Sequence, residues 1–171
     1  MSYIVSATIM LVVLLSLIAI FGEAREAIKT GKRRLRKAEQ EKLITQAIEM
    51  KGQLHKLDAD SFLKLVVHIY EEIGYKTKLL PLGKEDALLL EQRGGYTLMV
   101  YKNSSWPISR EALETFYYHK TKMGLDCMMV ISTGGFNASA WEWSKEQLGI
   151  RLINEEDFID LCKEIAAPRA S

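Results

Sequence analysis

The stretch Leu98-Met99-Val100-Tyr101-Lys102 is the most informative part of this 171-residue chain. Apolar and aromatic residues that end on a lysine predict a buried β-strand with a charged last residue. Residues two apart in a strand share a face, so Val100 and Lys102 point the same way and Met99 and Tyr101 the other. The strand therefore sets Val100 beside Lys102 at one end of a sheet.

An acidic residue opens the strand that comes before this one. Residues Asp86 to Glu91 predict a strand, and Arg93-Gly94-Gly95 predicts the hairpin turn into the strand from Tyr96 to Tyr101. We therefore expect Asp86 and Lys102 at matching strand ends, because a hairpin joins antiparallel strands. Two plainer interpretations stay open: Asp86 caps the turn, and Lys102 is simply a charged strand end.

Helices and strands alternate through the rest of the globular part. A helix begins among the N-cap residues Asp58 to Ser61 and stops at Gly74, and a strand from Tyr75 to Leu80 is closed by Pro81-Leu82-Gly83. After Lys102 the pattern predicts helix, strand, helix, short strand and helix, at 109–123, 127–132, 137–148, 150–153 and from 154 onward. The expected N-caps of these three helices are Ser109, Asn137 and Asn154. The order αβββαβ followed by αβα predicts an α/β fold, a mixed sheet with helices on both faces.

The first residues of the chain predict a membrane anchor. Tyr3 to Phe21 is a run of nineteen residues without charge or proline, close to the length of about 20 that spans a bilayer. A cleaved signal peptide is the alternative, but it would have a basic segment before a shorter apolar run. Seven Lys and Arg residues follow between Arg25 and Lys37, which predicts a single-pass protein of the cell membrane with its N-terminus outside and its C-terminal domain in the cytoplasm.

We therefore expect four segments: an anchor at 1–22, a basic helical stalk at 23–57, a globular domain at 58–167 and a tail at 168–171. The lipid bilayer is the expected partner of the first two, and the stalk is a candidate for self-association. The globular part, residues 58–171, has 13 Lys and Arg against 17 Asp and Glu, a net charge of −4. It has no overall basic footprint of the kind that DNA-binding domains carry.

The cysteines, histidines and tryptophans predict no special chemistry. Cys127 and Cys162 are expected to be buried free thiols, in agreement with a reducing compartment. The three histidines lack the spacing of zinc ligands. Trp106, Trp141 and Trp143 are expected to serve in packing or at an interface rather than as platforms for nucleic-acid bases.

In this order the elements resemble the restriction-endonuclease-like fold of the PD-(D/E)xK nucleases, and within it the Mrr catalytic family. Three passages carry the resemblance, at 61–75, at 83–102 and at 132–153, and it covers about residues 60–165. The resemblance implies a DNA endonuclease that uses Mg²⁺. By the same resemblance, Asp86 is the first metal ligand, the backbone carbonyl of Tyr101 a second, and Lys102 the catalytic lysine.

The sequence departs from that family at two positions. The acid or glutamine two residues before the lysine is Val100 here, and the glutamate of the first helix is Leu63. Because a valine has no lone pair for a metal ion, the metal site is expected to be degenerate. Glu85, Glu111 and Glu114 are the acids that could compensate, although for the two helical glutamates a solvated helix face is the plainer interpretation.

Three functions follow from these features. The first is a membrane-anchored endonuclease of Mrr type, also called type IV restriction-endonuclease-like, which would need Mg²⁺ if active. The second is an inactive nuclease-fold module, without a cofactor, that binds DNA or a protein at the cytoplasmic membrane face. The third is a scaffold whose stalk oligomerises.

Overall fold

The computed structural model describes residues 30, 32, 34–83 and 85–167, apart from the side chain of Asp86. The chain divides into two compact units, Met1–Glu39 and Gln40–Ser171, and every strand belongs to the second. In the first unit the described residues, 30, 32 and 34–39, are helical. The predicted anchor at 1–22 lies outside the described residues. Among those that are described, no helix is both long and apolar enough to cross a membrane.

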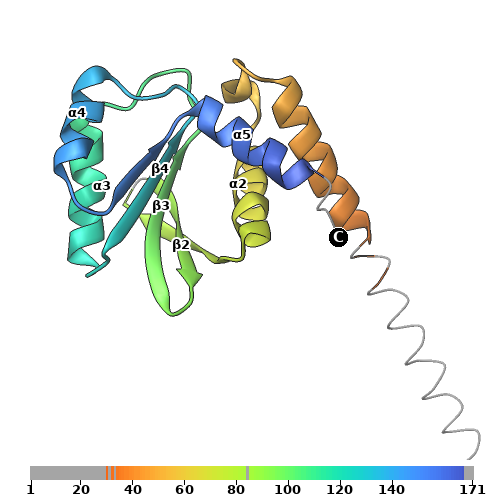
Figure 1. Cartoon of the computed structure of the whole chain (residues 1–171), viewed down its shortest axis with the longest axis horizontal. Coiled ribbons are helices and arrows are strands. Elements are labelled where there is room, and N and C mark those ends of the chain that lie inside the picture. Colours follow the sequence, from red (N-terminus) through yellow and green to blue (C-terminus); the bar gives the residue numbers. More distant parts are fainter. Residues whose placement is uncertain (1–29, 31, 33, 84, 168–171) are drawn as a thin grey trace, which may run out of the picture. The chain divides into compact units, whose positions relative to one another are not determined.

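A five-stranded mixed sheet forms the centre of the second unit (Figure 1). Its strands lie in chain order: β1 (Lys76–Leu82), β2 (Glu85–Gln92), β3 (Gly95–Lys102), β4 (Cys127–Ser132) and β5 (Ile150–Ile153). The first three strands form an antiparallel meander, and β3, β4 and β5 run parallel. The prediction of a mixed sheet is confirmed, with β3 at its centre.

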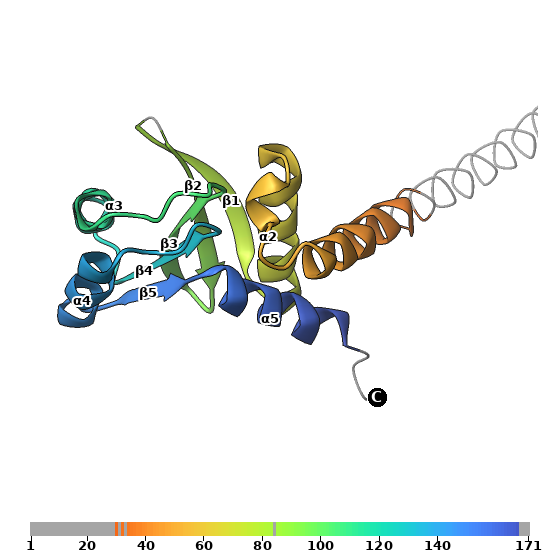
Figure 2. The ribbon, with the colours of Figure 1, turned by 90° about the horizontal axis from the view of Figure 1, so that it is seen from above.

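Helices cover both faces of this sheet, as expected (Figure 2). One face carries α2 (Ala59–Ile73) and α5 (Glu155–Ala166), and the other carries α3 (Arg110–Lys122) and α4 (Ala138–Glu146). Each face buries its own apolar cluster. Phe62 of α2 and Phe158 of α5 pack at 5.8 Å between ring centroids on the first face. Leu113 of α3 and Trp143 of α4 pack on the second.

The predicted N-caps begin all four of these helices. The side chains of Asp58, Ser109, Asn137 and Asn154 each accept a hydrogen bond from the backbone N–H three residues later, at 2.9, 3.4, 2.8 and 2.9 Å. Such a bond satisfies one of the free N–H groups in a first helical turn. Gly74 ends α2 in the left-handed conformation, with φ of 103°.

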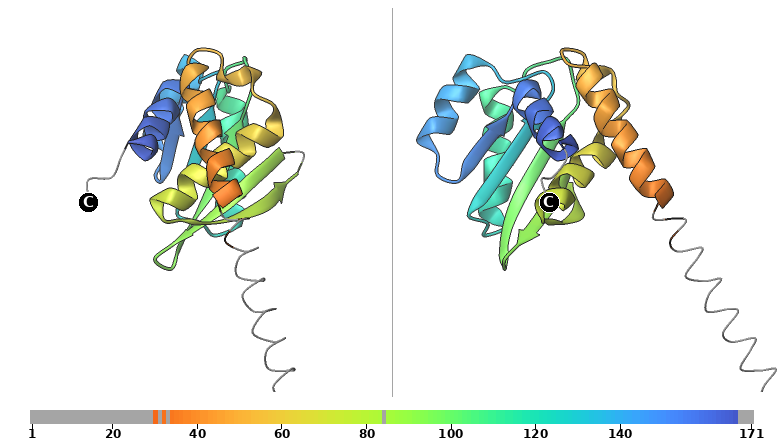
Figure 3. Two further views of the ribbon diagram at one scale, coloured as in Figure 1. Left: turned by 90° about the vertical axis from the view of Figure 1, so that its right-hand side faces the viewer. Right: turned by 45° about the vertical axis from the view of Figure 1, so that its right-hand side comes forward.

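Residues 40–57 belong to the second unit, although the sequence assigns them to the stalk. Residues 40–49 are helical, and a short 3₁₀ helix, η1 (Leu54–Lys56), follows. Ile44, Ala47, Leu54 and Leu57 are buried in the cluster that α2 and α5 share, beside which the segment lies in Figure 3. The backbone N–H of Leu54 also donates to the Glu155 carboxylate at 2.8 Å. The segment thus completes the core on this face.

Two local expectations are wrong. Pro81 and Leu82 continue β1 instead of closing it, since β1 is an edge strand, where proline is tolerated. Cys127 is exposed, because it is the first residue of β4 and lies at the edge of the core. Cys162 is buried as expected, and burial raises the pKa of its thiol to about 12.

Candidate functional site

Lys102 ends β3 in an ion pair with a carboxylate of the neighbouring strand. The register pairs Ala87 with Val100, so Glu85, two residues before Ala87, lies across from Lys102 and on the same face. The Lys102 Nζ donates to Glu85 Oε2. The two side chains are 31% and 39% exposed, so water reaches the pair and weakens the attraction between the charges. The acid that the structure brings to Lys102 is therefore Glu85.

Asp86 occupies the second position of β2 and pairs with Pro81 of β1. Asp86 directly follows Glu85 in β2, and adjacent residues of a strand point to opposite faces of the sheet. The side chain of Asp86 lies outside the described residues. The predicted Asp86 and Lys102 pair therefore stays a prediction.

Val100 is part of the core on the face that carries Lys102. Its side chain is 0% exposed and belongs to the apolar cluster with Ala87, Leu98 and Val130. A magnesium ion needs about six oxygen ligands, several of them waters, around it. A fully buried isopropyl group leaves no room for that shell at this position.

A pocket of about 380 Å³ opens between the first turn of α2 and the ends of β2 and β3. Its lining residues are Ala59, Asp60, Phe62, Leu63, Glu85, Tyr101 and Asn103. Leu63, which stands where the resembling family has a glutamate, contributes an apolar wall. Tyr101 packs its ring against Phe62 with 6.4 Å between centroids. Two carboxylates, those of Asp60 and Glu85, line this pocket, but each already has a lysine partner, Lys64 and Lys102.

The two helical glutamates have partners near the start of their own helix. Glu114 accepts from Arg110 Nε at 2.7 Å. A hydrogen bond from the Ser109 side chain lowers the pKa of Glu111. Within the described part of the chain, neither glutamate forms an ion pair with Lys102. Glu85 is therefore the one compensating acid that the structure brings to this lysine.

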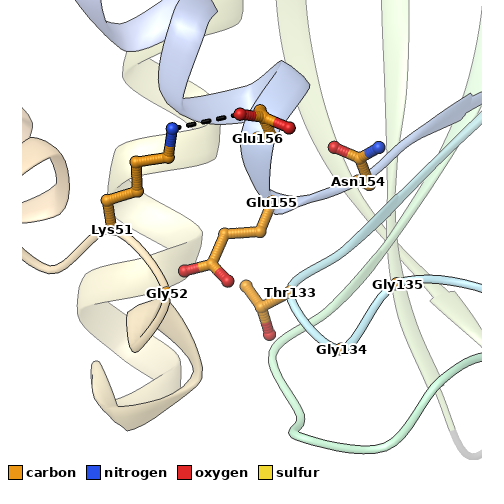
Figure 4. Close-up of a pocket in the computed structure, with 8 residues that line it drawn as sticks. All are labelled: Lys51, Gly52, Thr133, Gly134, Gly135, Asn154, Glu155 and Glu156. Atoms are coloured by element: carbon orange, nitrogen blue, oxygen red, sulfur yellow. Dashed lines mark hydrogen bonds and ion pairs between the residues drawn. The ribbon is translucent and has the colours of Figure 1, made fainter.

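A second pocket, of about 600 Å³, lies past the carboxyl ends of β4 and β5 (Figure 4). It is lined by Lys51, Gly52, Thr133, Gly134, Gly135, Asn154, Glu155 and Glu156. Lys51 Nζ donates to Glu156 Oε1 at 3.0 Å, and this contact raises the pKa of Lys51. Crevices at the carboxyl ends of parallel strands commonly bind ligands. Here the wall carries two carboxylates against one ammonium group, so its charge does not favour an anion.

Thr133, which sequence analysis did not single out, joins the Lys102 strand end to the following loop. The Thr133 N–H donates to the Lys102 carbonyl oxygen at 3.1 Å, and Thr133 Oγ1 accepts from the Ser104 N–H at 2.9 Å. Beside it, Ser132 is in register with Lys102, and its buried Oγ has no hydrogen-bond partner within the described part of the protein. The sequence feature that could have indicated Thr133 is the Ser-Thr pair at the end of an apolar strand.

The described side chains do not fit a magnesium site. Within the described residues, no group of three or more His, Cys, Asp or Glu side chains is arranged to hold a metal ion. The positions that supply two of the ligands in the resembling family hold Val100 and Leu63, and both are apolar. No catalytic step through a metal ion follows from this set of donors.

Comparison with known proteins gives the family. The family model Mrr_cat, described as restriction endonuclease, matches residues 54–162. No curated protein matches the chain. A crystal structure described as that of a protein of unknown function, AF1548, is 17% identical, over 71% of this chain and 72% of that one, with a TM-score of 0.47. Since the family model covers more than half of the sequence, this chain belongs to the Mrr_cat restriction endonuclease family.

Proposed function

We propose that this chain is a membrane-anchored DNA-binding member of the restriction endonuclease family with a degenerate metal site. Val100 carries the proposal, because it is fully buried among apolar side chains where the family has a metal-binding acid or glutamine. Leu63 supports it, as the apolar counterpart of the family's helix glutamate. DNA as the partner comes from the family.

The ion pair of Lys102 is compatible with DNA binding. In a working nuclease the lysine must be available to the attacking water and to the charge that develops on the phosphate. Here its ammonium group is bound to Glu85. A lysine that is held in this way can still take part in binding DNA when a phosphate oxygen displaces the carboxylate, because that exchange leaves one ionic contact in place of another.

A plasmid assay on the full-length chain in mild detergent tests this function. We expect salt-dependent DNA binding, without Mg²⁺- or Mn²⁺-dependent nicking of supercoiled DNA. The nicking assay is repeated with Lys102→Ala and Asp86→Asn, which separate activity of this chain from that of a contaminant. Metal-dependent nicking that both variants abolish would overturn the degenerate site. A chain that binds no DNA at any salt concentration would overturn the whole proposal.

An active endonuclease is the second candidate, and the contact of Glu85 with Lys102 favours it. Glu85 would then replace the carboxylate lost at position 100, from the neighbouring strand and on the same face. The discriminating variant is Glu85→Gln. It would abolish metal-dependent nicking if Glu85 is a ligand, and it would leave an inactive chain inactive.

We further propose that residues 1–22 anchor the chain in the cell membrane, with the N-terminus outside and the second unit in the cytoplasm. The uncharged run of nineteen residues and the basic segment after it support this topology. The basic residues would also contact anionic lipids, and the stalk would self-associate. Carbonate extraction of membranes, protease protection in spheroplasts and crosslinking of the full-length chain test the three statements in turn.

A further inference from the structure

Hydrogen bonds fix the loop after β3, residues 103–108, along its whole length. The Asn103 side chain donates to the Leu57 carbonyl oxygen, and the Ser104 N–H donates to Thr133 Oγ1 at 2.9 Å. The Trp106 N–H donates to Ser104 Oγ at 3.1 Å. At the far end, the Ile108 N–H donates to the Gly135 carbonyl oxygen at 2.9 Å. The loop therefore holds a defined shape against the β4–α4 turn.

Gly134 makes this contact possible. A Cβ atom built on Gly134 would lie 2.6 Å from the Ser104 carbonyl oxygen and closer still to that of Trp106. Only a residue without a side chain lets the two backbones approach so closely. The close packing fixes the backbone of Trp106 four residues beyond Lys102.

Trp106 nevertheless turns its side chain to solvent. It is 79% exposed, whereas Trp143 is 8% exposed and Trp141 is partly buried against Phe136. Of the two roles predicted for Trp106, packing within the fold does not apply, and a role at an interface stays a prediction. An indole this exposed gains little from the hydrophobic effect in the folded chain, although it is the largest apolar side chain available.

We propose that Trp106 is a stacking platform for an unpaired base of DNA. The inference rests on the DNA-binding function proposed above and narrows its substrate to DNA with an unpaired or extruded base. Proteins that bind single-stranded nucleic acid stack its bases on aromatic side chains, since every base offers a flat face. In a closed duplex, bases stack on each other and leave no face for the indole.

A base accounts for this surface better than a protein partner does. Protein interfaces bury contiguous apolar surface with aromatic residues at its centre. Five residues of the loop and the facing turn are polar or small: Asn103, Ser104, Ser105, Gly134 and Gly135. Pro107 is the exposed apolar residue next to Trp106 in the loop, and Ile108 is buried. A lone aromatic ring among hydrogen-bonding groups suits a ligand that is flat on its face and polar on its edge.

Fluorescence titration of the full-length chain in detergent tests the assignment. A dye-labelled oligothymidylate and a dye-labelled closed duplex of equal length are titrated with the native chain, with Trp106→Ala and with Trp106→Phe. The anisotropy of the dye gives the affinity of each variant, and the tryptophan emission of the native chain gives the quenching. Tyr118→Ala is the matched control, because Tyr118 is 61% exposed on α3, away from this loop in the sequence. Thermal unfolding of each variant is followed in parallel.

We expect the oligothymidylate to quench the emission of the native chain, and Trp106→Ala to bind it at least about tenfold more weakly. Trp106→Phe should restore most of the affinity, and Tyr118→Ala should bind as the native chain does. If Trp106→Ala loses the same affinity for the oligothymidylate as for the duplex, the assignment of an unpaired base is wrong. Unchanged affinity of Trp106→Ala would overturn the role of Trp106 and leave the proposed function intact. If the native chain binds neither DNA, both proposals fall.

Discussion

At the scale of single residues, the strand register decides which acid meets the lysine. The sequence predicts strands around Asp86 and Lys102 and places both at one end of the sheet. It does not predict that Glu85 faces Lys102, because a shift of one residue exchanges the two faces of a strand. Val100 shows the opposite case: its place on the Lys102 face follows from the spacing of two residues alone, and the structure adds its complete burial.

Replacement of Val100 tests whether this position has room for a polar ligand. Val100→Glu should lower the free energy of unfolding by about 3 kcal/mol or more, because it places a carboxylate in an apolar cluster. Tyr96→Gln, at a 48% exposed position of the same strand, should lower it by much less, and it places no second carboxylate opposite Glu91. Urea unfolding measures both. Native stability of Val100→Glu would mean that the site accepts a charged ligand.

His68 makes stability depend on pH. Its side chain is 8% exposed on α2, and burial lowers its pKa from the usual 6.5, against the opposing effect of the carboxylates of Glu72, Glu71 and Glu41. The unfolded chain therefore binds the proton more readily than the folded chain does. The free energy of unfolding should decrease as the pH falls below about 6.5.

The variant His68→Gln isolates this contribution from that of the carboxylates. Urea unfolding at several pH values between 5 and 8 should give a shallower pH dependence for His68→Gln than for the native chain. If the native chain and His68→Gln lose stability in parallel as the pH falls, the assignment fails.

At the scale of elements, the signals in the sequence are strong where they are local. Asp58, Ser109, Asn137 and Asn154 predict the four helix starts, since an N-cap acts within three residues. The end of β1 is missed, because whether a strand tolerates Pro81 depends on its place in the sheet. The contact of Gly134 with the Trp106 loop joins segments almost thirty residues apart in the sequence, so no local sequence pattern predicts it.

Gly134→Ala tests that contact between elements. The added methyl group meets backbone atoms, which cannot move aside as a flexible side chain can. We expect a loss of roughly 1–3 kcal/mol in the free energy of unfolding, together with weaker quenching of the tryptophan emission by an oligothymidylate. Gly94→Ala is a poor control because of its positive φ, so Gly95→Ala, with 3.6 Å to its nearest neighbour, is used. If Gly134→Ala keeps the native stability and the native quenching, the conformation of the Trp106 loop does not depend on Gly134.

At the scale of the whole molecule, the family model and the compact unit begin at different residues. The model match starts at residue 54, whereas the unit starts at Gln40 and buries Ile44 and Ala47 with the sheet. The sequence of residues 40–57 suggests a stalk, because its charge and helical spacing continue those of the basic segment. Its apolar positions find their partners only in the folded sheet, which explains why the boundary could not be read from the pattern.

Two leucines distinguish the packed segment from the residues before it. Leu54→Ala should lower the free energy of unfolding by about 2–5 kcal/mol, since Leu54 is 0% exposed in the core. Leu35→Ala, at a 74% exposed helical position of the first unit, should leave it unchanged. Both are measured by urea unfolding of the full-length chain. Equal effects would mean that residues 40–57 do not share the core.

The two cysteines give this protein a built-in reporter. Cys127 is exposed and Cys162 is buried, with a thiol whose pKa is raised to about 12, so a maleimide dye at neutral pH should attach at one position only. Cys127 pairs with Thr97, and Lys102 pairs with Ser132 at the opposite end of the same two strands. A dye there would sit five rungs from the candidate site, far enough to leave it undisturbed and near enough for energy transfer to a labelled DNA end.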